Sequence, residues 1–308
     1  MTWQLDDIPD QTGRTILVTG CTIGGLGHQT SLELARRGAQ VILAGRNEPR
    51  LRQTEAAIVD EVPTAELRRL VIDLADLASV RRAVESVESL DVLVNNAGIM
   101  APAYSRTVDG FESQLGTNHF GPFLLTGLLL PLLRTAGEAG HDARVVTVSS
   151  QMHRATRSAP LGDPRVEHGH YLRWPEYAQS KLANLLFTFE LDRRLREADI
   201  PVRALAAHPG FAGTHLVANG QLGRTTGTVA SILETTVKAV SQSPADGALP
   251  TLMAVTADLP GATYCGPSGL GEARGAPRIV GASSLAHDAD AQRRLWELSE
   301  EAVGLSYP

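Results

Sequence analysis

The sequence predicts a single α/β domain in which helices cover both faces of a doubly wound parallel sheet of about seven strands. Short apolar runs of strand length alternate with segments of helical apolar spacing along the whole 308-residue chain. A Gly-rich turn also stands between the first apolar run and the first helical segment. Because parallel strands need crossover connections, this alternation gives a parallel sheet with right-handed helical crossovers. The apolar fraction of 43% is ample for one large core.

Six apolar runs are expected to be buried strands, at residues 15–19, 40–44, 70–72, 91–94, 144–148 and 202–206. Helices are expected at residues 30–37, 77–87, 178–196 and 288–303. The first of these helices carries Leu32 and Ala35 at helical spacing, and Gly38 marks its end. A Gly-rich loop at 266–281 precedes the last helix.

The chain has no internal repeat and no linker-like break before about residue 210, so one domain over residues 1–308 is expected. Residues 15–210 are expected to form the cofactor and catalytic core. Residues 211–243 are richer in Gly, Thr and Ser, and they are predicted to form a mobile substrate lid with a helix. Residues 244–308 are expected to supply the C-terminal helices, the last strand and the tail.

The composition excludes several classes of protein. The net charge is −6 and no basic stripe dominates, so no nucleic-acid partner is expected. Two cysteines, Cys21 and Cys265, are too few for a disulfide framework and fit a reducing compartment. Residues 1–10 lack the order of a secretory signal. The longest apolar stretch, 123–133, contains Pro131 and is too short to span a membrane, so a cytoplasmic protein is expected.

The Gly-rich turn at residues 19–27 is a candidate dinucleotide-binding loop of a Rossmann-type fold. Its glycines let backbone N–H groups approach a pyrophosphate, and the N-terminus of the following helix stabilises the phosphate charge. Such a loop alone is a weak signal, and the alternative is an ordinary tight turn between a strand and a helix.

The end of the second strand indicates which dinucleotide is bound. Arg46 lies 21 residues after Gly25, where the adenosine ribose is expected to rest. An acidic residue there would hold a ribose 2′-hydroxyl, whereas an arginine pairs with a 2′-phosphate. NADP(H) is therefore favoured, with NAD(H) as the alternative. Arg46 could also be an ordinary surface charge in an arginine-rich chain.

Tyr177 and Lys181 open a strongly apolar helix and form a candidate acid–base pair. A spacing of four places the phenol and the ammonium on one helix face, about one turn apart. Reducing a ketone needs a donor with a pKa nearer 7 than the usual 10 of tyrosine, a change of roughly 4 kcal/mol. A cation about 4 Å away supplies about that much at an effective dielectric constant of 20. The alternative, a surface lysine, is weakened because the chain has only two lysines against twenty-six arginines.

These residues belong to a longer series of motifs that follows the expected strands in order. The series consists of the Gly-rich loop, Asp73-Leu74, Asn95-Asn96-Ala97-Gly98, Asn118, Val148-Ser149-Ser150, Tyr177 with Lys181, and Pro209-Gly210 with Thr214. With this series the chain resembles the short-chain dehydrogenase/reductase family, in particular its retinol-dehydrogenase-type branch and the bacterial relatives of that branch. The resemblance covers residues 15–214, about two thirds of the chain.

The resemblance implies catalytic roles for four residues. Tyr177 would donate the proton in carbonyl reduction or accept it in alcohol oxidation. Lys181 would lower the pKa of the tyrosine and hold the nicotinamide ribose hydroxyls. Ser150 would hydrogen-bond the substrate oxygen and orient it. Asn118 would anchor a water molecule that links Lys181 to solvent.

The resemblance also implies a cofactor trough. Asp73 would meet the adenine amino group, and Thr214 would fix the nicotinamide carboxamide. The full set expected to bind the cofactor is Gly20, Thr22, Ile23, Gly25, Leu26, Gly27, Arg46, Asp73, Leu74, Asn96, Ala97, Gly98, Tyr177, Lys181, Pro209, Gly210 and Thr214. No metal site is expected.

Structural alternatives exist for several of these residues, and the chain departs from the family pattern in its Gly-rich loop. Ser150 could merely end a strand, Asp73 could be a turn residue, and Asn118 could bond backbone where its helix bends. Four residues separate Gly20 from Gly25, so one residue is inserted relative to the family loop. His28 stands where relatives often carry lysine.

The loop between Ser150 and Tyr177 and the predicted lid are expected to determine the substrate. Tyr171 and Trp174 are expected to wall the pocket, and Leu216, Val217 and Leu222 to close over it. The expected partner is a small hydrophobic alcohol or carbonyl compound. His168 and His170 have no acidic or cysteine partner at ligand spacing, so a solvated loop is favoured over a metal site.

The leading hypothesis is an NADP(H)-dependent oxidoreductase that interconverts an alcohol and a carbonyl. The main alternative is a non-catalytic dinucleotide-sensing protein on the same fold, against which the intact catalytic set argues. A sugar-nucleotide epimerase or dehydratase would be expected to have a larger C-terminal domain. The apolar helical segments 120–132 and 182–189 either cover the sheet or pack a homodimer.

Overall fold

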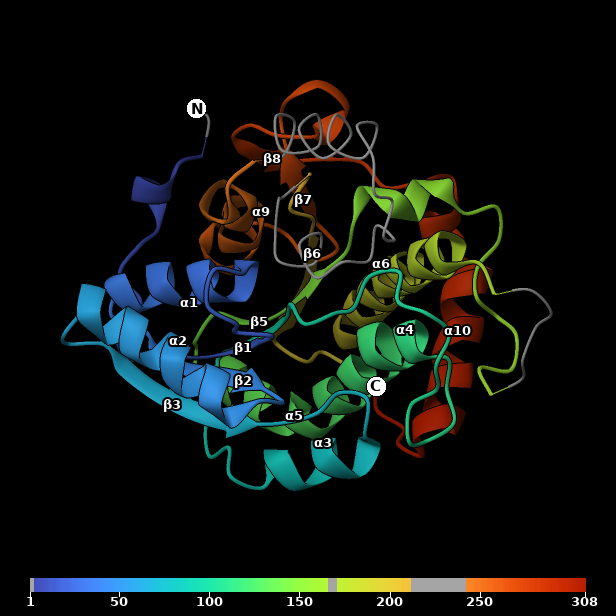
Figure 1. Cartoon of the computed structure of the whole chain (residues 1–308), viewed down its shortest axis with the longest axis horizontal. Coiled ribbons are helices and arrows are strands. Elements are labelled where there is room, and N and C mark those ends of the chain that lie inside the picture. The colour runs from blue at the N-terminus through green and yellow to red at the C-terminus, as the bar shows by residue number, and fades with distance from the viewer. Residues whose placement is uncertain (1–2, 166–170, 212–241) are drawn as a thin grey trace, which may run out of the picture.

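The computed structural model describes residues 3–165, 171–211 and 242–308 (Figure 1). Within them one sheet has eight strands in the order β3-β2-β1-β4-β5-β6-β7-β8, and only β7 and β8 pair antiparallel. The strands are β1 (Thr15–Thr19), β2 (Gln40–Gly45), β3 (Glu66–Val71), β4 (Val92–Asn95), β5 (Ala143–Val148), β6 (Val202–Ala207), β7 (Tyr264–Pro267) and β8 (Pro277–Ile279). The predicted doubly wound α/β sheet is confirmed, with one strand more than the seven expected.

Helices cover both faces of this sheet (Figure 1). Ile16 and Val18 of β1 pack toward α1, α2 and α9, whereas Leu17 packs toward α3, α5 and α6 on the opposite face. This alternation is the period of two that a strand buried on both faces requires. The helices are α1 (Leu26–Arg36), α2 (Glu48–Glu61), α3 (Leu77–Val84), α4 (Ser113–Leu115), α5 (Gly121–Glu138), α6 (Arg173–Glu197), α9 (Pro244–Thr256) and α10 (Ala289–Val303).

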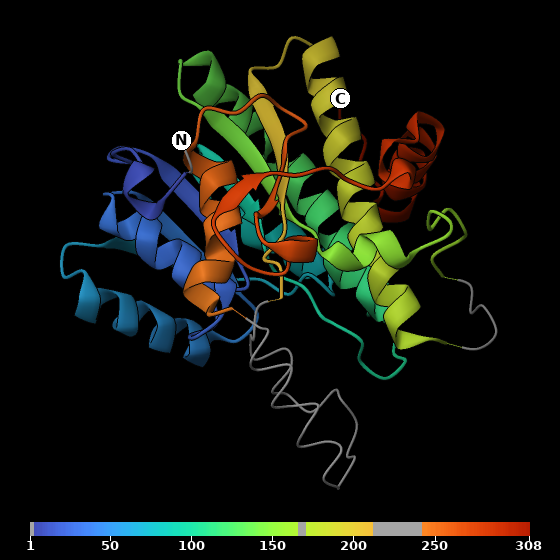
Figure 2. The ribbon, with the colours of Figure 1, turned by 90° about the horizontal axis from the view of Figure 1, so that it is seen from above.

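The C-terminal helix α10 packs beside the long helix α6, as both views show (Figures 1 and 2). Trp296 of α10 is 1% exposed, and its ring stacks on Phe187 of α6 with a centroid separation of 5.9 Å. The last residues return to α5, where the Tyr307 hydroxyl donates to the Phe123 carbonyl at 3.0 Å. The C-terminal segment therefore braces α6, the helix that carries Tyr177 and Lys181.

Several element boundaries differ from the prediction. Helix α1 begins at Leu26, four residues before the predicted start, because Gly25 is its N-cap, and helix α3 ends at Val84 rather than 87. Strand β3 begins at Glu66, four residues before the predicted start. The prediction missed these residues because this edge strand exposes Glu66 and Arg68 and so lacks an apolar pattern. Helix α6 begins at Arg173 rather than 178, so Tyr177 lies in its second turn and not at its start. Strand β8 lies inside the predicted Gly-rich loop, where three mostly exposed residues give no strand signal.

Helix α5 is longer than the apolar stretch suggested. Together with α4 and a π-helical turn, η2 (Gly116–Phe120), it forms a continuous helical segment of 26 residues, Ser113–Glu138, which runs through Pro131. By length and composition this segment is able to cross a membrane, a criterion that core helices of soluble proteins also meet, and 56% of its apolar window is buried within the fold. The length argument that excluded a span is therefore weakened. Phe123 and Leu124 cover the sheet and are fully buried.

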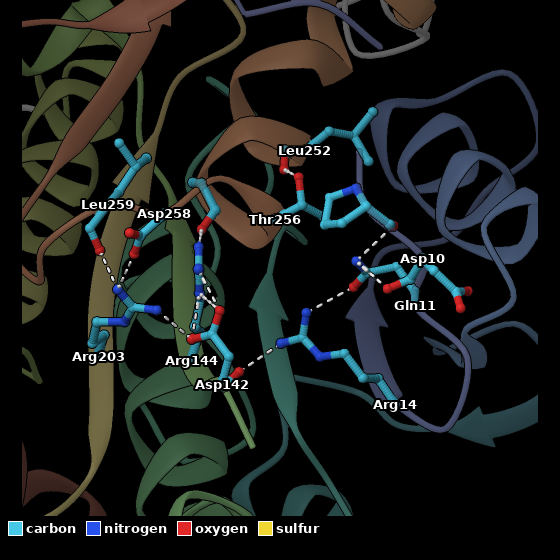
Figure 3. A network of polar contacts seen from close by, with 12 residues as sticks. Asp10, Gln11, Arg14, Asp142, Arg144, Arg203, Leu252, Thr256, Asp258 and Leu259 are labelled. Atoms are coloured by element: carbon cyan, nitrogen blue, oxygen red, sulfur yellow. Dashed lines mark hydrogen bonds and ion pairs between the residues drawn. The ribbon is translucent and has the colours of Figure 1, made fainter. Parts of the chain in front are cut away.

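A polar network closes the edge of the sheet at which β5 and β6 begin (Figure 3). Arg144, 1% exposed, donates through Nε to both oxygens of Asp142 and through Nη1 to the Ala254 carbonyl at 2.8 Å. Arg203 donates to Asp142 Oδ1 at 2.6 Å, and Arg14 donates to the Asp142 carbonyl. These contacts join the strand starts to α9, and they leave the opposite edge, where the strands end, for the candidate site.

Candidate active site

The Gly-rich loop between β1 and α1 has a shape that requires its glycines. Gly20 and Gly24 have φ angles of +76° and +73°, in the left-handed region that disfavours other residues. A Cβ on Gly20 would lie 2.9 Å from the Ala97 Cα, and one on Gly27 would lie 2.6 Å from the Gly20 carbonyl oxygen. The loop therefore packs directly on the loop after β4, and Gly25 is the N-cap of α1.

The inserted residue is accommodated by contacts within the same loop. The Gly25 amide donates to the Thr22 carbonyl at 2.9 Å, and the Gly24 amide donates to His28 Nδ1 at 3.3 Å. His28 is 6% exposed, and burial lowers its pKa, which favours the neutral ring that this acceptor role requires. His28, at the position where relatives often carry lysine, thus holds the longer loop in place.

A cleft of about 480 Å³ opens at the ends of the first four strands. The predicted cofactor residues that line it are Gly20, Thr22, Ile23, Gly25, Leu26, Arg46, Asp73, Leu74, Asn96, Ala97 and Gly98. Residues that sequence reasoning missed also line it: Thr19, Cys21, Ala44, Gly45, Asn47, Arg50, Leu51, Gln53, Ile72, Ile99 and Thr117. A cleft over a glycine loop and a helix N-terminus suits a dinucleotide.

The far end of the cleft is cationic. Arg46 and Arg50 both line the cleft and are both exposed. Asn47 caps α2 by accepting from the Arg50 amide at 3.0 Å, which fixes the first turn on which Arg50 stands. Sequence reasoning missed Arg50, although its position four residues after Arg46 could have identified it as a second cationic residue of the cleft. Asp73 lines the same cleft and also accepts from the Ala75 amide at 3.0 Å, so the predicted turn role is present too.

Ser150, Tyr177 and Lys181 come together where β5 ends against α6. The Lys181 ammonium donates to the Val148 carbonyl at 3.1 Å and lies 5.7 Å from the centre of the Tyr177 ring. The Ser150 side chain lies close enough to the Tyr177 phenol to influence its pKa. Tyr177 and Lys181 are 8% and 4% exposed. The structure therefore brings together Ser150 and Tyr177, which were expected to act on the substrate oxygen, and Lys181, which was expected to act on Tyr177 and the cofactor ribose.

Burial controls the protonation of this pair. It raises the pKa of Tyr177 to about 12, although the neighbouring Ser150 side chain opposes the rise. It lowers the pKa of Lys181 to about 8. Desolvation of the phenol is the largest cause of its shift, and the lowering of the Tyr177 pKa by Lys181 stays a prediction. At neutral pH Tyr177 carries its proton and Lys181 is mostly charged.

Asn118 stands in the π-helical turn η2, a rare geometry often found at functional sites. Its amide nitrogen donates to the Ile99 carbonyl and to the Ser180 hydroxyl, each at 2.9 Å, and its oxygen accepts from the Ile99 amide at 2.8 Å. A Cβ on Gly98 would lie 3.0 Å from Asn118 Oδ1 and 3.4 Å from Lys181 Nζ. Asn118 therefore bonds the backbone, as the structural alternative expected. The water link from Asn118 to Lys181 stays a prediction.

The turn Pro209–Gly210 follows β6. Gly210 has a φ of +64°, and a Cβ there would lie 2.4 Å from the Ala273 carbonyl oxygen, so the turn requires glycine. Thr214, the predicted lid residues Leu216, Val217 and Leu222, and the His168–His170 motif lie outside the described residues. Within the residues that are described, no three His, Cys, Asp or Glu side chains form a metal-binding group.

The two aromatic residues predicted to wall the pocket differ in their surroundings. The Trp174 ring lies 6.3 Å from the Tyr177 ring at 85° and is 42% exposed, so it stands beside the reacting phenol with a free face. The Tyr171 hydroxyl is occupied by polar contacts: it accepts from Gln114 at 2.8 Å and donates to Glu112 at 3.2 Å. Trp174 is the better candidate for substrate contact.

Comparisons with known proteins agree with this geometry. A family model described as short chain dehydrogenase matches residues 14–161. Human retinol dehydrogenase 13 is 38% identical over 306 residues, which cover 96% of this chain and 86% of that protein. An uncharacterized oxidoreductase of Schizosaccharomyces pombe is 42% identical over 222 residues. These cover 70% of this chain and 65% of the yeast protein, so the match spans less than two thirds of that relative.

Solved structures give the same result. A crystal structure of a protein from Mycobacterium paratuberculosis has a TM-score of 0.80 and 42% identity, with 100% of both chains covered. A short chain dehydrogenase from Shigella flexneri 2a, crystallised in complex with NADP, has a TM-score of 0.59 and 25% identity. The match covers 81% of this chain and 94% of the Shigella chain.

Proposed function

The chain belongs to the short-chain dehydrogenase/reductase family, in its retinol-dehydrogenase-type branch, and from this premise we propose that it interconverts a hydrophobic alcohol and carbonyl with NADP(H). The family makes it an NAD(P)-dependent oxidoreductase. The observation that carries the proposal is the meeting of Ser150, Tyr177 and Lys181 at the strand ends, where an open parallel sheet binds its ligands.

Tyr177 acts as the general acid in the reducing direction. The phenol is protonated at neutral pH, and the proton is given to the substrate oxygen as negative charge develops there. Ser150 holds that oxygen, because its hydroxyl lies near the phenol and is able to donate to the same acceptor. In the oxidising direction Tyr177 receives the alcohol proton.

Lys181 supplies positive charge beside the phenol and favours the phenolate left after proton transfer. The ammonium has two further donors beyond its bond to Val148, and these suit the ribose hydroxyls of a dinucleotide. A bound nicotinamide dinucleotide supplies or accepts the hydride. Asn118, held on Ile99, is proposed to carry the water that renews the proton through Lys181.

The preference for NADP(H) rests on charge at the adenosine end. Arg46 and Arg50 both line the cleft, and a guanidinium pairs well with a 2′-phosphate. Asp73 is the one acidic residue among the described residues of the cleft, and it stands at the end of β3 rather than of β2. The Shigella relative crystallised with NADP supports the same assignment.

The preference for a hydrophobic substrate rests on the apolar surface beside Tyr177. Trp174 and Leu172 are 42% and 60% exposed at the start of α6. The name of the human relative, retinol dehydrogenase 13, points to a hydrophobic alcohol. Action in the cytoplasm and pairing as a homodimer stay predictions of the sequence.

The proposal is tested by following NADPH oxidation with aliphatic, aromatic, terpenoid and steroidal carbonyl compounds. Turnover is expected with bulky hydrophobic carbonyls, and NADPH is expected to support it better than NADH. Tight NADPH binding without turnover of any compound would contradict the proposal and support a dinucleotide sensor.

A further inference from the structure

A partly buried polar cluster connects the loop that carries Ser150 with the turn that carries Gly210. Its centre is the carboxylate of Glu272, which belongs to a short 3₁₀ turn, η4 (Leu270–Glu272), between β7 and β8. His208 at the end of β6 and Gln151, the residue after Ser150, both contact this carboxylate. The proposed chemistry assigns no role to Glu272, His208 or Gln151.

His208 connects Glu272 to the turn at Pro209–Gly210. The ring is fully buried, and burial lowers its pKa to about 3, so it is neutral. Its Nδ1 accepts from the Gly210 amide at 3.2 Å, and its Nε2 lies 3.0 Å from Glu272 Oε2. A neutral ring that accepts at Nδ1 carries its proton on Nε2, so it donates to the carboxylate. A Cβ on Gly266 would lie 2.1 Å from Nε2, so only glycine leaves room for this contact.

Gln151 connects Glu272 to the Ser150 loop. The Gln151 amide nitrogen donates to Glu272 Oε2, and Arg154 Nη2 lies 3.7 Å from Oε1 of the same carboxylate. Arg154 also donates to the Gln151 side-chain oxygen at 3.0 Å. Gln151 and Arg154 lie in the 3₁₀ turn η3 (Gln151–Ala155), whose N-cap is Ser150. The carboxylate thus has partners on both loops.

The backbone at Glu272 has a strained conformation that a solvent-exposed turn does not require. Gly271 and Glu272 have φ angles of +61° and +55°, two successive left-handed residues, of which only the first is glycine. A residue with a side chain costs roughly 1 kcal/mol or more in this region. The Glu272 side chain is 16% exposed and ends among its partners rather than in solvent.

We propose that Glu272 is a positioning residue that fixes the Ser150 loop against the Pro209–Gly210 turn, through Gln151 on one side and His208 on the other. The role rests on the proposed function, because Ser150 is expected to hold the substrate oxygen and the turn to face the nicotinamide. A displacement of either loop by about 1 Å is enough to cost up to a hundredfold in rate.

The experiment compares two substitutions of Glu272. Glu272→Ala removes the acceptor of both Gln151 and His208. Glu272→Gln removes the charge but keeps a carbonyl oxygen that is able to accept from both donors. Glu301→Gln, an exposed change on α10, is the matched control.

The readouts are kcat at saturating NADPH, the Kd for NADPH and the Tm of each variant. Glu272→Ala is expected to lose about tenfold in kcat and to bind NADPH more weakly, whereas Glu272→Gln is expected to keep most of both. Glu301→Gln is expected to match the wild type. A Glu272→Ala variant that lowers Tm alone, with kcat and Kd unchanged, would overturn the positioning role, as would a Glu272→Gln variant no better than Glu272→Ala.

The positioning role of Glu272 and the proposed function fail in different ways. A wild-type protein that binds NADPH but reduces no carbonyl contradicts the proposed function, and the Kd values of the two Glu272 variants then test the positioning role alone. Equal Kd values for Glu272→Ala and the wild type overturn the effect on cofactor binding even where the wild type reduces a carbonyl.

Discussion

The Lys181 ammonium lies 5.7 Å from the centre of the Tyr177 ring, with both side chains buried one helical turn apart on α6. The bond from Lys181 to the Val148 carbonyl ties this charge to the end of β5. The rigid sheet edge, rather than a flexible loop, therefore sets the position of the charge beside the phenol. Proton transfer from Tyr177 leaves a phenolate, which a neighbouring cation stabilises.

The protonation of Lys181 predicts a pH dependence. With a pKa of about 8, the ammonium is lost as the pH rises through 8, and the rate of carbonyl reduction is expected to fall there. Between the folded pKa and the ordinary value near 10.5, the folded state binds fewer protons than the unfolded state, so this group makes stability rise with pH. Unfolding linked to Lys181 thus cannot explain the fall. A pH profile of kcat/KM that stays flat from about pH 7 to 9.5 would contradict the role.

Arg46 is expected to set the cofactor preference. Arg46→Asp removes a charge-assisted contact with the 2′-phosphate and offers a carboxylate to a ribose hydroxyl. The Kd for NADPH is expected to rise about tenfold to a hundredfold, with NADH binding retained or improved. Arg52→Asp is the matched control, because Arg52 lies nearby on helix α2 and pairs with Glu48 of that helix. An equal rise in the Kd for NADPH in both variants would contradict the assignment of Arg46 to the 2′-phosphate.

Trp174 is expected to select hydrophobic substrates. Trp174→Ala removes apolar surface beside Tyr177, and the KM for an aromatic or terpenoid carbonyl is expected to rise about tenfold. The KM for a small aliphatic ketone serves as the control and is expected to change little. An equal rise for both compounds would show that the variant disturbs Tyr177 itself.

The network at the opposite edge of the sheet is expected to carry stability rather than activity. Burial alone would raise the pKa of Asp142, but hydrogen bonds from Arg144 and Arg203 hold it below its ordinary value. Asp142→Asn leaves Arg144 buried without its counter-charge, and a loss of about 3 kcal/mol in the free energy of unfolding is expected. Asp258→Asn, at a fully exposed partner of Arg203, is the control in urea unfolding. An equally small effect of both changes would show that the network is replaceable.

Local patterns in the sequence were sufficient for much of this site. Gly20 and Arg46 follow directly from the strands that precede them, and the spacing of Tyr177 and Lys181 places them on one face of α6. The Glu272 contact with His208 joins positions 64 residues apart on loops without a motif, so no spacing reveals it. Strand β8 pairs through its backbone with β7, and its exposed side chains give no apolar pattern.

The burial of Tyr177 was not predictable from neighbouring residues in the sequence. The expectation considered the attraction of Lys181 and omitted the cost of burying the phenol. Burial depends on the packing of distant segments, and it raises the pKa of the phenol.

The measurement that tests the central claim most directly is single-turnover NADPH oxidation by Tyr177→Phe with a carbonyl that the wild type reduces. The variant keeps the ring beside Trp174 and Lys181 and loses only the hydroxyl. A loss of about 10²- to 10⁴-fold in rate is expected, with the Kd for NADPH within about twofold of the wild type. A variant that oxidises NADPH at the wild-type rate would contradict the account.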